Sequence, residues 1–131
     1  MEQRAINPWS WQNQFGFVQG NELQGMQRVL LCSGQASVDA DGGPLHAGDM
    51  RAQLTQALDN LETVLQAAGF TLADVVRLNI YTTDVDRMLE ATDVLAGRMG
   101  GTGGQHTSTL LGVTRLAIPG LMVEIEATAA A

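Results

Sequence analysis

The sequence of 131 residues fits one domain, residues 1–131, with a buried core. Its net charge of −7 repels phosphate backbones, which argues against nucleic-acid binding as the main task. All seven basic residues are arginines, so Schiff-base chemistry on a protein lysine and a Walker-type phosphate loop are excluded.

The sequence also indicates where the protein works. No apolar run approaches the roughly 20 residues that span a bilayer. The amino-terminal segment lacks the apolar core of a secretory signal. The single cysteine, Cys32, cannot form an internal disulfide. These features predict a cytoplasmic protein without membrane contact.

The first predicted elements are two short strands, at residues 15–20 and 28–33, joined by a turn. A loop rich in turn formers follows. Its Asp39 and Asp41 resemble the start of a calcium loop, but Met50 stands where the bidentate glutamate belongs. We therefore expect a solvated turn there and no bound metal.

The clearest predicted element is a helix over residues 49–68. Its apolar residues recur at helical spacing and form one stripe: Leu54, Ala57, Leu58, Leu61, Val64, Leu65 and Ala68. Asp49 is the expected N-cap, and Gly69 is the expected residue just beyond the last turn.

The second half of the chain alternates strands and a helix. In the strand predicted over 74–83, one face carries Val76, Leu78, Ile80 and Thr82, and the other carries Arg77, Asn79 and Tyr81. A second helix starts at about Asp86, capped by Asp84 or Asp86, and ends at the glycine run 100–104. Two further strands are expected over 107–116 and 121–128.

The predicted element order is β-β-α-β-α-β-β. It favours an α+β fold in which both helices cover one face of a mostly antiparallel sheet. The other sheet face would be bare, and a domain of this size covers such a face most readily by oligomerisation.

Several segments, in order and with matching spacing, resemble motifs of the RidA/YjgF family. Asn7-Pro8-Trp9-Ser10 resembles G-P-Y-S, and Ser33-Gly34-Gln35 with Gly43-Pro44-Leu45 and Gly48-Asp49-Met50 resembles S-G-Q … G-x-L … G-D-I. The run from Gln53 to Gly69 resembles Q-T-x-Q-x-L-x-N-L … A-A-G, Asp74-Val75-Val76-Arg77 resembles D-V-V-K, and Val123-Glu124-Ile125-Glu126-Ala127 matches V-E-I-E-A.

This resemblance implies a chorismate-mutase-like fold, a homotrimer, and small-molecule clefts between its subunits. It implies no cofactor. Founding members of the family hydrolyse enamine and imine products of pyridoxal-phosphate enzymes. In those members an arginine in a P-A-R-S stretch binds the substrate carboxylate.

That arginine is missing here. Ser108 stands at its position, followed by Thr109, and no shift of alignment restores it because no arginine lies between Arg98 and Arg115. The family's second-helix asparagine is replaced by Thr92. A charge-assisted bond is worth about 1.5–3 kcal/mol against about 1 kcal/mol for a neutral one, so we predict weak deamination of simple 2-imino acids. An arginine of a neighbouring subunit is the one substitute that the sequence leaves open.

The resemblance assigns two sets of residues to the cleft. Glu124 matches the glutamate that positions water, the alternative being an exposed strand-face carboxylate beside Glu126. Ser33 and Gly34 match a cleft floor where a bare backbone allows close approach of a ligand, the alternative being a simple strand end.

Other candidates rest on side-chain chemistry. Trp9 replaces the family's tyrosine at the cleft mouth, and it could stack on a ligand together with Trp11, or both could bury area at a subunit contact. Ser108 and Thr109 could hydrogen-bond an uncharged ligand or be ordinary strand residues. His106 could carry a positive charge or shuttle a proton, although loop histidines are more often surface groups.

Two functions of different class follow. The first is a small-molecule cleft protein, either a hydrolase or deaminase of altered specificity or a binder, in which Glu124 would orient water. The second is a non-catalytic ligand-binding or regulatory protein of the same fold. Ribonuclease activity, attached to some relatives by name, is disfavoured by the acidic charge.

Overall fold

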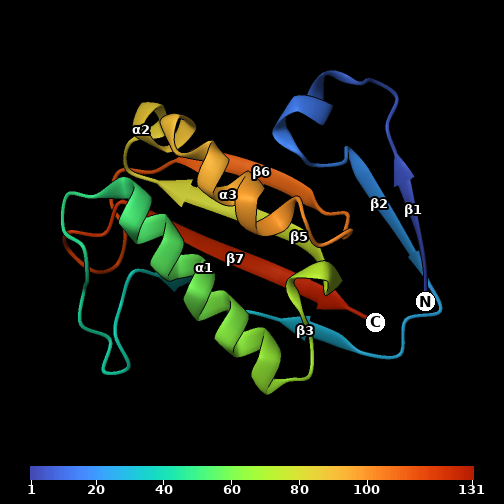
Figure 1. Cartoon of the computed structure of the whole chain (residues 1–131), viewed down its shortest axis with the longest axis horizontal. Helices are drawn as coiled ribbons and strands as arrows, with labels where there is room; N and C mark the ends of the chain where they lie inside the picture. The colour runs from blue at the N-terminus through green and yellow to red at the C-terminus, as the bar shows by residue number, and fades with distance from the viewer.

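A five-stranded sheet forms the centre of the computed structural model, which describes residues 1–131 (Figure 1). The strands lie in the order β3 (Val29–Leu31), β7 (Val123–Ala130), β5 (Val75–Thr82) and β6 (Thr107–Gly112), while β4 (Gln35–Ala36) also pairs with β7. Only β5 and β6 run parallel. The predicted α+β class with a mostly antiparallel sheet is confirmed.

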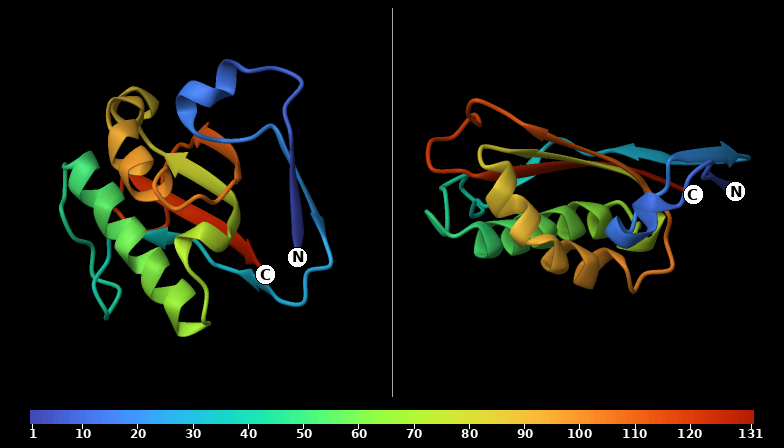
Figure 2. Two further views of the ribbon diagram at one scale, coloured as in Figure 1. Left: turned by 45° about the vertical axis from the view of Figure 1, so that its right-hand side comes forward. Right: turned by 90° about the horizontal axis from the view of Figure 1, so that it is seen from above.

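All three α-helices cover the same face of this sheet (Figure 2). They are α1 (Met50–Ala67), α2 (Val85–Glu90) and α3 (Thr92–Met99). The predicted second helix is therefore two helices, because Ala91 leaves helical geometry with φ −105° and ψ 9°. Together α2 and α3 form the crossover that parallel pairing of β5 and β6 requires.

Helix α1 supplies much of the core, as its apolar stripe predicts. Leu54, Leu58 and Leu61 are fully buried within a cluster of 18 residues shared with β5 and β7. The Asp49 carboxylate accepts a hydrogen bond from the Ala52 amide at 3.0 Å, which confirms the N-cap. Gly69 adopts a φ of +78° just beyond the helix, which confirms its place there.

A buried amide fixes the start of α1 to the sheet. Gln53 donates to the carbonyls of His46 and Gly120 and accepts from the Met122 amide at 2.8 Å. It thereby joins the loop before α1 to the entry of β7. The short 3₁₀ helix η2 (Leu72–Asp74) then leads from α1 into β5.

The sheet face opposite the helices carries polar side chains, and we call it the open face. Arg77, Asn79 and Tyr81 of β5 alternate with buried residues, as the pattern predicts. Glu124 and Glu126 of β7 lie opposite Tyr81 and Asn79 on the same face. No helix covers it in the side view of Figure 2.

The amino-terminal region differs from the prediction. Residues 1–24, which we call the N-terminal arm, form a separate two-stranded sheet from β1 (Glu2–Ile6) and β2 (Gly20–Gln24), with the 3₁₀ helix η1 (Trp11–Phe15) between them. The strand expected at 15–20 does not form. Phe15 and Phe17 instead stack on each other and line a cavity together with residues of the sheet and helices.

The last two predicted strands are shifted. The first ends at Gly112, and the second starts at Val123. Between them Leu116 and Leu121 form a small satellite core with Ala36. None of the helices is both long and apolar enough to cross a bilayer.

Candidate functional site

A cavity of about 260 Å³ opens between the N-terminal arm and the helix-covered side of the sheet. We call it the apolar cavity, because most of its lining is hydrophobic. The lining residues are Trp11, Phe15 and Phe17 from the arm, Ile80, Met88, Leu89, Thr92 and Leu95 from β5 and the helices α2 and α3, and Ser108 and Leu110 from β6.

The arm contributes three rings that touch one another, which we call the aromatic wall. The ring centroids of Trp11 and Phe17 are 5.9 Å apart with an edge-to-face angle of 77°. Phe15 lies 6.4 Å from Trp11 and 6.5 Å from Phe17. Trp11 and Phe15 nevertheless keep 55% and 52% of their surface exposed, so the wall is open to a ligand.

The remaining polar groups of the cavity are two hydroxyls. Ser108 pairs with Leu78 in the parallel β5–β6 register, on the helix-covered side of the sheet, and its hydroxyl makes no hydrogen bond within the chain. The Thr92 hydroxyl donates to the Leu89 carbonyl at 3.1 Å. None of the chain's arginines lines this cavity. It therefore offers hydrogen bonds but no charge.

The residues matched to the cleft floor and water-positioning glutamate lie elsewhere, on the open face. A methyl group on Gly34 would come within 2.0 Å of a Glu124 carboxylate oxygen, so the glutamate occupies the space that a side chain would fill. Ser33 precedes Gly34 and is exposed.

A β-bulge brings Gly34 to this position. Leu31 is opposite Thr128, and Gln35 is opposite Ile125. The β3–β4 segment therefore advances by one more residue than β7 over the same length, which leaves its backbone unpaired beside Glu124.

A second carboxylate on the open face is held by hydrogen bonds. Tyr81 donates its hydroxyl proton to Glu126, and the Asn79 amide donates to the same oxygen at 3.3 Å. These hydrogen bonds lower the pKa of Glu126, and the one from Tyr81 raises the pKa of that phenol. The Glu126 carboxylate therefore already accepts hydrogen bonds from its neighbours, whereas the Glu124 carboxylate does not.

Two other predicted residues lie outside the apolar cavity. Trp9 is 62% exposed and does not line it, whereas Trp11 does. Thr109 is exposed and alternates with Ser108, so it belongs to the open-face side of β6 beside Asn79. The structure thus separates Ser108 from Thr109, which adjacency in sequence had grouped.

His106 is not the surface group that loop histidines usually are. It is only 7% exposed, and burial lowers its pKa. Its carbonyl accepts a hydrogen bond from the Val18 amide at 2.9 Å, which ties the arm to the start of β6.

The charged sites of the chain do not offer an obvious metal centre. No group of three or more His, Cys, Asp or Glu side chains is close enough to hold a metal ion. The Asp39 carboxylate accepts from the amides of Asp41 and Gly43, both at 2.9 Å, as in a self-contained turn.

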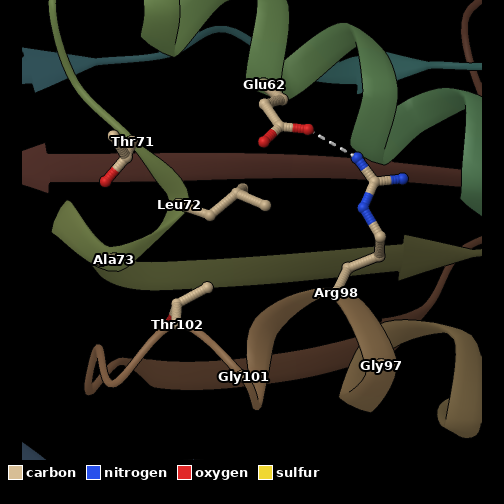
Figure 3. Close-up of a pocket in the computed structure, with 8 residues that line it drawn as sticks. All are labelled: Glu62, Thr71, Leu72, Ala73, Gly97, Arg98, Gly101 and Thr102. Carbon is tan, nitrogen blue, oxygen red and sulfur yellow. Dashed lines mark hydrogen bonds and ion pairs between the residues drawn. The ribbon is translucent and has the colours of Figure 1, made fainter.

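A larger hollow of about 490 Å³ lies between the end of α1, η2 and the end of α3 (Figure 3). Its single cation, Arg98, donates to Glu62 at 2.8 Å, the bond drawn in Figure 3, and to Asp59 at 2.6 Å. Because both carboxylates already neutralise this guanidinium, the hollow lacks a free charge for an anion.

Sequence reasoning missed the aromatic wall. It placed Phe15 and Phe17 in a strand and chose Trp9 over Trp11 as the first cleft aromatic. The available signal was the density of aromatic residues between 9 and 17 in a chain with few others.

Comparison with known proteins agrees with this architecture. A family model described as endoribonuclease L-PSP matches residues 15–131. A crystal structure from Yersinia pestis, of a Rid-family protein of unknown function, is 36% identical, covers all of both chains and has a TM-score of 0.88.

Two curated relatives are similar at the sequence level. A RutC family protein of Pyrococcus horikoshii is 31% identical over 76% of this chain and 77% of its own. A 2-iminobutanoate/2-iminopropanoate deaminase of Escherichia coli is 34% identical over 53% of this chain and 52% of its own. The chain belongs to the endoribonuclease L-PSP family, which is the RidA/YjgF family that its motifs resemble.

Proposed function

We propose that this chain is a homotrimeric protein with small-molecule clefts between subunits, whose ligand lacks the carboxylate of a 2-imino acid. The observation that carries the proposal is Ser108. It stands where the family resemblance expects an arginine, in a cavity without any charged side chain. A carboxylate buried there would lose its hydration and find no cation in return.

The two halves of the proposed cleft come from different subunits. Within one chain, Ser108 lies on the helix-covered side of the sheet and Glu124 on the open face. A cleft that contains both therefore takes the apolar cavity from one subunit and Glu124, with Gly34, from the next. In that arrangement Glu124 orients a water molecule toward the ligand.

Hydrolysis of enzyme-generated 2-iminopropanoate tests the missing arginine. The wild-type chain should be slower than an arginine-bearing relative by about tenfold or more, and Ser108→Arg should raise its rate. A wild-type rate equal to that of the relative would refute the proposal. Thr109→Arg is the matched control, because it adds the same side chain to the other face.

A mixing experiment tests the composite cleft. The double variant Ser108→Arg with Glu124→Ala should lose the activity gained by Ser108→Arg. Mixing it with wild-type chain after unfolding and refolding together should restore part of that activity, since the arginine and the glutamate then meet across an interface. No recovery in mixed trimers would refute the composite cleft.

The apolar cavity also supports a second function, ligand binding without chemistry. None of its ten lining residues carries a titratable group, so no general acid or base comes from the cavity itself. Stabilisation against heat by neutral ligands, with no turnover of any of them, would favour this second function. If Glu124→Ala removes that stabilisation, the result would favour the composite cleft over binding in the apolar cavity alone.

RNA cleavage is not the activity that we propose, although the family model carries that name. The net charge of −7 opposes a polyanionic substrate.

We further propose that the chain acts as one domain in the cytoplasm. Burial raises the pKa of Cys32, which keeps this half-buried thiol protonated and unreactive.

A further inference from the structure

The geometry points to a specific ligand class for the apolar cavity: an uncharged small molecule with an aromatic ring as its body and one polar group. This inference rests on the proposed function and names the chemistry of its ligand. It comes from the aromatic wall, from the floor beneath it, and from the polar atoms that the cavity contains.

The aromatic wall presents ring surface that the rest of the chain leaves uncovered. Trp11, Phe15 and Phe17 contact one another, yet more than half of the first two side chains faces solvent. Exposed rings gathered at a cavity are typical of a binding surface, because each offers a large area at a small cost in side-chain entropy. Aromatic ligands gain stacking or edge contacts there beyond the area that they bury.

The floor opposite the wall is aliphatic. Its accessible part consists of Leu89 of α2, Leu95 of α3 and Leu110 of β6, because Ile80 and Met88, which also line the cavity, are buried. A flat ring between this floor and the aromatic wall therefore contacts apolar groups on both sides.

The polar atoms of the cavity determine which polar group the ligand can carry. The Ser108 hydroxyl can donate one hydrogen bond and accept others, while the Thr92 hydroxyl has already given its proton to Leu89. This set can satisfy one neutral polar group, such as an amide. It contains no cation that could neutralise a carboxylate or a phosphate.

The volume favours a small molecule over a protein segment. At about 260 Å³ the cavity is slightly below the roughly 300–1,000 Å³ of sites that hold drug-sized ligands. This volume suits a single substituted ring and not several side chains of a partner.

The test uses Trp11 as an internal reporter. The chain contains two tryptophans, so Trp9→Phe leaves Trp11 as the only indole. Benzamide, cyclohexanecarboxamide and benzoate are titrated into this variant, and dissociation constants are taken from its fluorescence. Benzamide should bind roughly three- to tenfold more tightly than its saturated analogue, and at least about tenfold more tightly than benzoate.

Three variants assign the effect to named residues. Phe15→Leu and Phe17→Leu keep the wall apolar but remove a ring, so each should bring the benzamide and cyclohexanecarboxamide constants closer together. Ser108→Ala should weaken benzamide by roughly three- to tenfold while leaving toluene, which has no polar group, unchanged. Met26→Ala removes an exposed apolar side chain outside the cavity and is the control. Thermal denaturation of each variant verifies that it is folded.

Several results would overturn the inference. They are equal binding of the aromatic and saturated amides, tightest binding of benzoate, and no saturable signal from any of the compounds at millimolar concentration. A fluorescence change that follows protein concentration instead of ligand would identify a second chain as the occupant, which also overturns it.

The outcome is separable from that of the proposed function, because binding is measured without turnover. Benzamide binding in a protein that hydrolyses nothing would leave this inference standing and remove the catalytic proposal. Hydrolysis of neutral aliphatic imines without benzamide binding would do the reverse.

Discussion

His106 lies at the start of β6 with 7% of its surface exposed, and burial lowers its pKa below the ordinary value of about 6.5. The unfolded chain therefore binds this proton more readily than the folded one. Stability linked to His106 is complete above about pH 6.5 and is lost as the pH falls from there toward the lower folded pKa.

The expected result is a free energy of unfolding that decreases as the pH falls below about 6.5, by at most about 1.4 kcal/mol per pH unit for one proton. Urea denaturation at several pH values measures it. His106→Gln should have a flatter profile over the same range. The idea fails if the two proteins show the same pH dependence, and His46→Gln, at an exposed loop position, controls for the second histidine.

Gly34 is a position where one methyl group should report on the placement of Glu124. Gly34→Ala forces the carboxylate to move, because the new atom would lie 2.0 Å from it. The carboxylate ends a flexible side chain, so we expect a modest cost, within about 1 kcal/mol. A double-mutant cycle with Glu124→Ala should remove most of that cost.

Unfolding free energies of the wild type, the two single variants and the double variant complete this cycle. Additive effects would mean that alanine at position 34 strains the backbone and leaves Glu124 in place. Gly16→Ala is unsuitable as a control because its φ is +76°, whereas Gly101→Ala lies outside the helices with open space around it and is a better one.

At the scale of elements, the N-cap of α1 is the feature most open to a clean test. Asp49→Ala removes the acceptor of the Ala52 amide and should destabilise the protein by about 1 kcal/mol. Asp49→Asn should restore most of that loss, since asparagine caps nearly as well. Thermal unfolding measures both, with Asp41→Ala in the exposed turn as the control. An unchanged melting temperature for Asp49→Ala would contradict this role.

The elements that the sequence predicts best are those that pack on the core. The stripe from Leu54 to Leu65 and the alternation in β5 each reflect one buried and one exposed side, so periodicity reveals them. The break at Ala91 was not predictable in this way. It changes the direction of the chain without interrupting the apolar residues on either side of it.

The N-terminal arm shows the limit of such reasoning. Strands β1 and β2 pair with each other and bury neither face deeply. Their sequences therefore lack the alternation of apolar and polar residues that marks a strand. Their pairing is reinforced by an exposed ion pair between Arg4 and Glu22. The large apolar side chains of Phe15 and Phe17 lie between these two strands in the sequence and line the apolar cavity instead.

The candidate site was also predictable only in part. Ser108 could be located because motifs on both sides of it fix the alignment. The aromatic wall could not, since which of several aromatic residues reaches the cavity depends on the turn of η1. The side of the sheet on which Glu124 lies followed from strand alternation, but its contact with Gly34 depends on the bulge.

At the scale of the whole molecule, the open face sets the expected assembly. Next to its polar side chains, Leu31 of β3 and Leu111 of β6 remain 77% and 50% exposed. We expect a particle of three chains in sedimentation equilibrium. Leu31→Glu adds a charge at this face and should shift mass toward the monomer, because an unpaired carboxylate would be buried on assembly.

Thr63→Glu adds the same charge on the exposed side of α1 and should leave the mass unchanged. A wild-type protein that stays monomeric at micromolar concentration would contradict this assembly, and with it the composite cleft.

The position of β7 has a consequence for how the protein is made. This strand is synthesised after every other described element, yet it lies in the interior of the sheet and pairs with β3, β4 and β5. Until residues 123–130 have left the ribosome, β5 has only one neighbour, and the leucines of α1 lack much of the sheet that buries them. The nascent chain therefore presents the apolar stripe of its longest helix unprotected, and a translation stop before Val123 yields a product for chaperones and proteases, not a smaller working protein.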